Sequence, residues 1–135
     1  MDVRQPSELW TLCQAAHSNS KRWFGTSDPA TDIASNMSHM VISLCSEAGN
    51  LAGIVKLIDR GELDPKDAHA YYEMVMTLTD VFMYVLNISA LLRCDLQKAY
   101  DQKVIANERR FMEDNKIHKP PEPGWRSVEY LGEKE

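Results

Sequence analysis

The feature that most constrains this chain is a long stretch in which apolar residues recur at helical spacing. Between residues 30 and 59 they follow one another mostly at threes and fours: Ile33, Met37, Met40, Val41, Leu44, Ala48, Leu51, Val55 and Ile58. This is the period of an amphipathic α-helix and not the alternation of a β-strand. We therefore expect a helix from about Ala30 to Asp59, ended by Arg60 and Gly61.

A second long helix is expected after a short break. Asp64 is predicted to be its N-cap, and Pro65 to take its first helical position, where a missing N–H costs nothing. The helix is predicted to reach about Leu92, and its segment Val81 to Leu86 is apolar nearly all round. One neighbouring helix cannot bury such a surface. The segment needs neighbours on several sides, as in a four-helix bundle or a subunit interface.

Two shorter helices complete an all-α expectation. Ser7 is predicted to cap a first helix that ends at about Asn19, and Asp95 to cap a last helix from Leu96 to about Met112. The proline-rich segment after Lys116 cannot continue a helix. We expect a helical domain over residues 1–115, in four main helices, and an extended C-terminal arm over residues 116–135.

Charge and composition limit the classes of partner. The chain has 135 residues, enough for one domain, and carries 15 lysines and arginines against 20 aspartates and glutamates. No dense basic stripe indicates a surface for a nucleic-acid polymer, so a small ligand or a protein partner is expected. The three cysteines are odd in number and lack metal-ligand spacing, which favours a reducing cytoplasm with cysteines as small buried hydrophobes.

The one candidate for a membrane span is the apolar stretch from Met74 to Leu92. It contains five polar residues, Thr77, Thr79, Asp80, Asn87 and Ser89, whereas a span needs roughly 20 predominantly apolar residues. A buried helix is therefore predicted there. The N-terminus holds no apolar segment of signal-peptide length, so a cytoplasmic protein with no membrane contact is expected.

Two polar pairs interrupt the apolar faces of the long helices. Glu47 and Asn50 are three residues apart, as are Thr77 and Asp80, so each pair shares one helix face. If the two helices pack antiparallel, the pairs meet in the groove between them. The result is an oxygen-lined site suited to a hard cation such as Mg²⁺.

Two further sets of residues are candidates for ligand contact. Trp23 and Phe24 either stack on a nucleobase or close one end of the core. Lys103, Asn107 and Arg110 share one face of the last helix, where they either hold a phosphate or form an ordinary solvated face.

The chain resembles the all-α, MazG-like nucleoside triphosphate pyrophosphohydrolases, which are related to dCTP pyrophosphatases. The resemblance spans Trp23 to Phe111 and rests on three segments: Leu44 to Ala52, Thr77 to Leu86, and Asp95 to Phe111. The first is similar to a family motif with two glutamates three residues apart. The second is similar to a motif with a glutamate and an aspartate at the same spacing, and the third to the closing helix.

The resemblance implies a homo-oligomeric helical bundle, dimer or tetramer, in which carboxylates hold Mg²⁺ and the metal holds a triphosphate. Water then attacks the α-phosphorus and releases a nucleoside monophosphate and pyrophosphate. By position, Glu47 and Asp80 match two of the four expected metal ligands and would be the catalytic residues. Lys103 and Asn107 match closing-helix residues that contact the nucleotide.

Two of the four expected carboxylates are replaced. Asn50 stands where the first motif has its second glutamate, and Thr77 where the second motif has its glutamate. Both residues keep a neutral oxygen, which predicts a weakened Mg²⁺ site. Glu73, one turn before Thr77, either lends a carboxylate from a shifted position or is an ordinary solvated residue.

Three functions remain open. The first is a nucleotide-binding protein that has lost efficient hydrolysis and senses or sequesters a nucleotide or a nucleotide-derived signal, with Lys103 and Arg110 holding phosphates directly. The second is an active Mg²⁺-dependent pyrophosphohydrolase with a reduced carboxylate set. The third is an interaction protein whose pocket is empty. We rank the first slightly ahead of the second.

Overall fold

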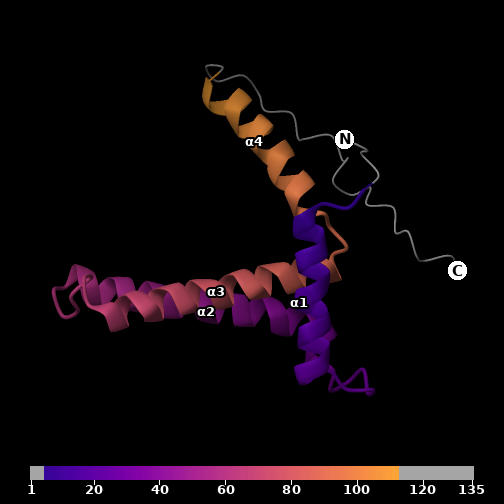
Figure 1. Ribbon diagram of the computed structural model, residues 1–135, viewed down its shortest axis with the longest axis horizontal. Helices are drawn as coiled ribbons and strands as arrows, with labels where there is room; N and C mark the ends of the chain where they lie inside the picture. The colour runs from indigo at the N-terminus through magenta and orange to yellow at the C-terminus, as the bar shows by residue number, and fades with distance from the viewer. Residues whose placement is uncertain (1–4, 113–135) are drawn as a thin grey trace, which may run out of the picture.

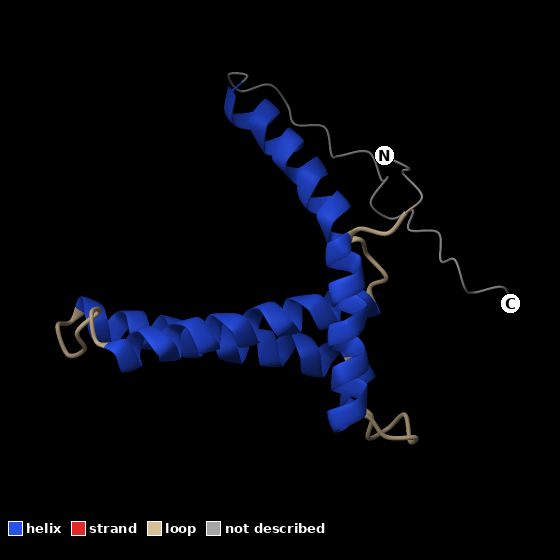
Figure 2. Ribbon diagram, in the orientation of Figure 1, coloured by secondary structure: helices blue, strands red, loops and turns tan. Residues whose placement is uncertain are grey.

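The fold is all-α in a computed structural model that describes residues 5–112. Over this range it contains four α-helices and one short 3₁₀ helix, without any strand (Figure 2). They are α1 (Glu8–Phe24), η1 (Ile33–Ser35), α2 (Met37–Asp59), α3 (Ala68–Leu91) and α4 (Leu96–Met112). The all-α prediction is confirmed. The boundary predicted at residue 115 and the C-terminal arm lie outside the described residues.

The helices are arranged as a long hairpin with two attachments at its base (Figure 1). Helices α2 and α3 run antiparallel along each other, and α1 crosses α3 at the end of the hairpin away from its connecting turn. Helix α4 leaves that same end and points away from the hairpin. The first three helices therefore meet at the base, whereas the tip contains α2 and α3 alone.

Three helices begin at the polar side chains that their first turns require. Ser7 Oγ accepts from the Trp10 N–H at 3.0 Å, Asn36 Oδ1 from the His39 N–H at 3.0 Å, and Asp67 Oδ2 from the Ala70 N–H at 2.9 Å. Each bond satisfies a backbone donor that has no partner inside the helix. At the other end of α2, Gly61 adopts φ +73°, where glycine is favoured, and the chain turns towards α3.

Three predicted boundaries are wrong, each because local turn chemistry outweighs periodicity. Helix α1 continues past Asn19 to Phe24, and the Gly25 N–H then donates to the Lys21 carbonyl at 2.8 Å. The long helix α2 begins at Met37 and not at Ala30, because a turn and η1 occupy the preceding residues.

The start of α3 is the third such case. Asp64 and Pro65 do not begin the helix: Asp64 Oδ1 accepts from the Lys66 N–H at 2.8 Å in a separate turn. Asp67 then caps α3, which begins at Ala68. Two aspartates three residues apart are both suited to an N-cap, and the turn formed by the first leaves the second to start the helix.

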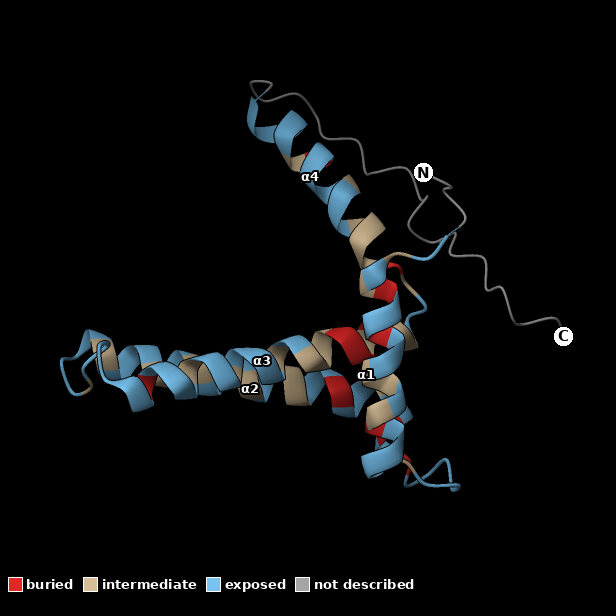
Figure 3. Ribbon diagram, viewed as in Figure 1, coloured by how far each residue is buried: buried red, intermediate tan, exposed pale blue. Residues whose placement is uncertain are grey.

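The core lies where α1 crosses α3 (Figure 3). Trp10 and Cys13 of α1 pack there with Leu86 of α3, and partly buried apolar neighbours surround them. Cys13 is buried as expected, but Cys45 is exposed in the single chain, so the prediction of buried cysteines is wrong for that residue. Burial raises the pKa of the Cys13 thiol, which keeps it in the neutral form.

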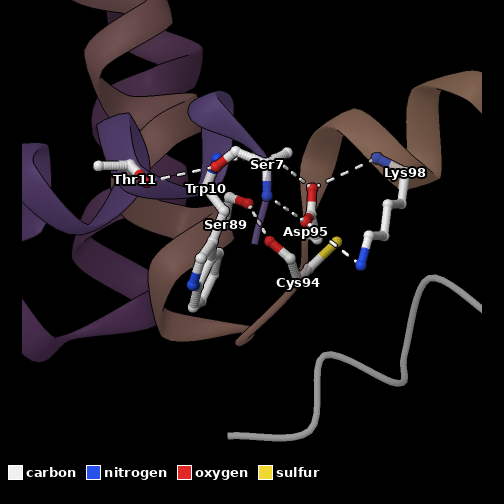
Figure 4. A network of polar contacts seen from close by, with 7 residues as sticks. All are labelled: Ser7, Trp10, Thr11, Ser89, Cys94, Asp95 and Lys98. Atoms are coloured by element: carbon white, nitrogen blue, oxygen red, sulfur yellow. Dashed lines mark hydrogen bonds and ion pairs between the residues drawn. The ribbon is translucent and has the colours of Figure 1, made fainter. Parts of the chain in front are cut away.

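Helix α4 is attached to α1 through a fully buried carboxylate, Asp95 (Figure 4). Asp95 Oδ2 accepts from the Ser7 N–H at 3.2 Å, and Asp95 Oδ1 accepts from Ser7 Oγ at 2.7 Å. Asp95 Oδ1 also accepts from the Lys98 N–H at 3.3 Å, which caps α4 as predicted. One side chain therefore caps α4 and holds the start of α1.

Exposed apolar stripes run along both helices of the hairpin. On α2 the stripe is Val41, Cys45, Ala48, Ala52 and Val55, and on α3 it is Tyr71, Val75, Leu78 and Phe82. Both follow the spacing of four and three that packs one helix on another. On each helix, the residues of the stripe come directly after the residues that face the other helix. Because the helices are antiparallel, both stripes turn to the same side of the hairpin.

By length and composition alone, α2 and α3 are each long and apolar enough to cross a membrane. Core and interface helices of water-soluble bundles meet the same criterion. Glu47 and Asp80 lie near the middle of these helices, where a carboxylate is costly in a lipid bilayer. Length and apolar content therefore do not distinguish a membrane span from a helix of a water-soluble bundle.

Candidate functional site

A hollow of about 390 Å³ lies at the base of the hairpin; larger hollows exist elsewhere in the described residues, but this one is called the main hollow because predicted site residues line it. Its volume is within the range of small-molecule sites. Residues of α1, η1, α2 and α3 line it: Ala16, Ser20, Trp23, Phe24, Ile33, His39, Met40, Glu47, Asp80, Met83, Tyr84 and Asn87. The crossing of α1 over the hairpin therefore forms a ligand-sized space that no single helix pair provides.

Four of the predicted site residues line this hollow together: Trp23, Phe24, Glu47 and Asp80. The two carboxylates come from facing helices, and the two aromatic side chains come from the last turn of α1. Trp23 is 53% exposed and Phe24 56% exposed, so they do not close the core of the single chain. Their rings meet edge to face with centroids 6.4 Å apart.

Asn50 and Thr77 lie one turn nearer the tip of the hairpin and do not line the main hollow. Asn50 Nδ2 donates to Glu47 Oε2 at 3.2 Å, so the amide acts on the carboxylate as a hydrogen-bond donor. This contact occupies part of the acceptor capacity of Glu47. Thr77 is half-buried on the side of α3 that faces α2.

Glu73 also lies outside the main hollow. Its Oε1 atom is 4.0 Å from His69 Nε2, and half of its side chain is exposed. In this position it is placed as a solvated residue and not beside Glu47 and Asp80.

The three predicted residues of α4 are separated from the main hollow within one chain. Lys103 lines a different hollow, between α4, Leu9 of α1 and Phe82 of α3. Asn107 is half-buried and Arg110 is exposed, with its guanidinium carbon 5.3 Å from the centre of the Phe111 ring. The lining of the main hollow contains no lysine or arginine.

Sequence reasoning missed several residues of the main hollow, above all Tyr84 and Asn87. They follow Asp80 at spacings of four and three, so they share its helix face, and extending the pattern by two turns would have found them. Asn87 is only 5% exposed, and its Nδ2 donates to the Met83 carbonyl at 2.9 Å. Its Oδ1 atom is buried and has no hydrogen-bond partner among the described residues.

The Mg²⁺ that the resemblance implies requires carboxylate ligands. Within residues 5–112, no group of three or more histidine, cysteine, aspartate or glutamate side chains is placed to hold a metal ion. Two carboxylates, Glu47 and Asp80, do share the hollow. Because Mg²⁺ is often held by one or two carboxylates, with water and substrate phosphates as the other ligands, this pair fits a weak site.

A second polar cluster joins α1 to η1. Lys21 Nζ forms an ion pair with Asp32 Oδ2, and this ammonium group lowers the pKa of the Asp32 carboxyl. Burial lowers the pKa of nearby His17, and the charge of Lys21 lowers it further. The cluster holds the end of α1 against η1, and so positions the turn that carries Trp23 and Phe24.

Chemically, the main hollow offers aromatic faces for a planar ring and two carboxylates for a cation. The carboxylates and the aromatic side chains come from different helices, so the crossing of α1 decides their proximity. Compared with models of protein families, with curated proteins and with solved structures, the chain has no match in any of the three.

Proposed function

We propose that the chain is a MazG-like protein that binds a nucleotide or a nucleotide-derived signal in the main hollow and has lost efficient hydrolysis. The observation that carries the proposal is the meeting of Trp23 and Phe24 with Glu47 and Asp80 in one hollow. A nucleotide needs both surfaces, since its base stacks on aromatic rings and its phosphates are bound through cations. The hollow would sense or sequester its ligand.

Loss of efficient hydrolysis follows from the electrostatics of the carboxylates. Asn50 and Thr77 supply neutral oxygens where the resemblance implies glutamates, and Asn50 also donates a hydrogen bond to Glu47. Both changes lower the negative charge available to a divalent cation. A ligand would then be bound with a weakly held metal or without one, and released chemically unchanged.

We also propose that the protein acts as a homo-oligomer. The two exposed stripes on one side of the hairpin are suited to a second copy, which would complete a four-helix bundle. Assembly would also supply the positive charge that the main hollow lacks. Lys103, Asn107 and Arg110 do not reach the main hollow of their own chain. In an oligomer, α4 of one protomer can supply cations to the hollow of another.

An active Mg²⁺-dependent pyrophosphohydrolase is the second candidate, favoured by the two carboxylates that do share the hollow. Glu47 and Asp80 would hold Mg²⁺, which when bound neutralises phosphate charge and activates water. Glu47→Gln would then abolish pyrophosphate release, whereas Glu73→Gln, outside the hollow, would leave it unchanged. An unchanged rate in Glu47→Gln would exclude this candidate.

The deciding experiment is calorimetric titration of the full-length protein with nucleoside triphosphates and cyclic or signalling nucleotides, with and without Mg²⁺. Each mixture is then assayed for pyrophosphate and for intact ligand. Tight binding with the ligand recovered intact is the expected result. Rapid Mg²⁺-dependent conversion to monophosphate would establish the enzyme instead, and no binding to any nucleotide would favour an interaction protein.

Trp23→Leu tests whether binding uses the main hollow. The substitution keeps an apolar side chain but removes the ring, and base stacking contributes roughly 1–3 kcal/mol, so the affinity should fall about fivefold or more. Tyr72→Leu is the matched control, because Tyr72 is an exposed aromatic residue of α3 outside the hollow. Equal affinity of the Trp23→Leu variant and the wild type would place the ligand elsewhere.

A further inference from the structure

The hollow that Lys103 lines, called here the α4 hollow, lies where α4 leaves the base of the hairpin (Figure 1). Its volume is about 700 Å³, and its wall consists of Leu9, Phe82, Cys94 and residues from the first two turns of α4. Phe82 is 43% exposed and Tyr100 is 63% exposed, so two aromatic side chains of this wall are partly uncovered. Apolar surface that is exposed in one concave place marks a docking site.

The chemistry of the wall selects the kind of occupant. Apart from Gln97 and Lys103, the residues that line the α4 hollow are apolar or aromatic. Burial of apolar side chains is the main favourable term in docking, and aromatic side chains bury the most area each. The α4 hollow is therefore suited to a segment with aromatic anchors and not to an anion.

Such a segment follows α4 in the same chain. Trp125, Val128, Tyr130 and Leu131 lie within seven residues of the C-terminal arm, and residues 125–131 are called here the anchor segment. Three prolines and Gly124 precede it, and proline does not continue a helix. The chain is therefore expected to leave the axis of α4 before the anchor segment begins.

The length of the arm matches the position of the α4 hollow. From Tyr100 to Met112, α4 rises about 18 Å at about 1.5 Å per residue. The twelve residues 113–124 span roughly 37 Å when extended, at about 3.1 Å per residue. The chain is thus long enough to run back beside α4 and bring Trp125 to the hollow.

We propose that the anchor segment docks in the α4 hollow of its own chain, with Trp125 and Tyr130 against Phe82 and Tyr100. A segment tied to its site by a short flexible linker has an effective concentration of order mM, which favours it over a separate partner. This docking goes beyond the proposed function, which does not depend on it.

The docked segment would have two consequences for the fold. It would hold α4 on α1 and α3 at a second place, besides the bond between Ser7 and Asp95. Because Phe82 is the last residue of the α3 stripe, the segment would cover that end of the stripe and leave Val75 and Leu78 to a second copy. Docking and assembly are therefore compatible.

The test uses Cys94, which lines the α4 hollow, as a fixed partner for cysteines placed in the anchor segment. Three full-length variants carry Cys45→Ala, which removes an exposed thiol, and one of Ser127→Cys, Val128→Cys or Glu129→Cys. Each is equilibrated with a glutathione redox buffer, in native conditions and in concentrated urea. The fraction of disulfide, measured by mass spectrometry after digestion, gives the effective concentration of the two thiols. In at least one variant it should be about tenfold or more higher in native conditions than in urea.

Lys119→Cys, combined with Cys45→Ala, is the matched control, because residue 119 lies before the anchor segment. Its effective concentration in native conditions should stay near the value in urea. Adding Trp125→Ser and Tyr130→Ser to the most strongly crosslinked variant removes both anchors, so its native value should fall to that of the control. None of these substitutions alters the core at the crossing of α1 and α3.

Equal native values for the anchor-segment variants and for Lys119→Cys would overturn the docking. A high value that survives Trp125→Ser with Tyr130→Ser would overturn the role of the aromatic anchors. A crosslink between two chains, seen without reductant as the mass of two protomers, would overturn the assignment to the chain's own hollow and give that hollow to the arm of a second copy.

Discussion

At the scale of single residues, the capacity of Glu47 to bind a cation depends on its neighbour Asn50. Its Oε2 accepts from Asn50 Nδ2, so a neutral donor lies where the resemblance implies a second carboxylate. Spacing alone placed the two residues on one face. It did not indicate that the amide would donate to the carboxylate, because that depends on the side-chain rotamers chosen in the folded helix.

Asn50→Glu should strengthen Mg²⁺ binding by about tenfold or more. A second carboxylate adds an anionic ligand beside Glu47 and removes the amide that competes for its oxygen, and tenfold corresponds to about 1.4 kcal/mol. Calorimetric titration with Mg²⁺ measures the change. Glu73→Gln, which alters a carboxylate outside the hollow, should not change the affinity. Unchanged affinity in Asn50→Glu would mean that Glu47 and Asp80 do not bind the ion.

The titration of His17 predicts how stability depends on pH. Burial, and then the charge of Lys21, lower the pKa of His17 below its ordinary value of about 6.5, so the unfolded chain binds a proton more readily than the folded one. The free energy of unfolding is therefore not reduced by His17 above about pH 6.5, and it falls as the pH drops towards the lowered pKa of this residue.

Urea denaturation at about pH 7.5 and about pH 5.5 checks this prediction. Wild type should lose more unfolding free energy between these values than His17→Gln. The pKa of Asp32 is lowered by Lys21, so its ion pair should stabilise the fold equally at both pH values. That stabilisation should be lost only below about pH 4. Identical pH profiles for His17→Gln and wild type would contradict the assignment.

At the scale of elements, the attachment of α4 to α1 depends on one buried carboxylate. The sequence identified Ser7 and Asp95 as separate caps of two helices, and the structure confirms both caps. What the sequence did not indicate is that the caps bond to each other, with Ser7 Oγ 2.7 Å from Asp95 Oδ1. Eighty-eight residues separate the two, and local patterns carry no information over that distance.

Ser7→Ala should lower the free energy of unfolding by about 1–3 kcal/mol, because it removes an N-cap and leaves Asp95 with one donor fewer. Chemical denaturation at one fixed protomer concentration measures the loss. Thr79→Ala, which removes an exposed hydroxyl bonded to its own helix, is the control and should change stability far less. A double substitution with Asp95→Asn should cost less than the sum of the single changes, since the two residues are in contact.

At the scale of the whole molecule, the hairpin leaves two apolar stripes without a partner inside the described chain. The core is confined to the crossing of α1 and α3, while Leu78 and Phe82 on α3 remain exposed. The sequence had already indicated that the segment Val81 to Leu86 needs neighbours on several sides. Within one chain, α1 and α2 supply only part of that surrounding.

Light scattering coupled to size exclusion should therefore give the mass of two or more protomers of 15.4 kDa each. Leu78→Glu places a charge in the centre of the α3 stripe and should shift the protein to monomer or to unfolded chain. Leu12→Glu is the control, because Leu12 is an exposed apolar residue of α1 outside both stripes. A wild-type mass of one protomer would contradict the assembly.

The sequence by itself determined the helical composition of this protein, because the period of its apolar residues and its polar caps are local properties of the chain. It also placed Glu47 with Asn50, and Thr77 with Asp80, on one face of each long helix. Only the tertiary structure decided that Trp23, Phe24 and Asn87 join them. Their proximity depends on the crossing of α1 over the hairpin, and that angle is set by the packing of Trp10 and Cys13 against Leu86 and not by any periodicity.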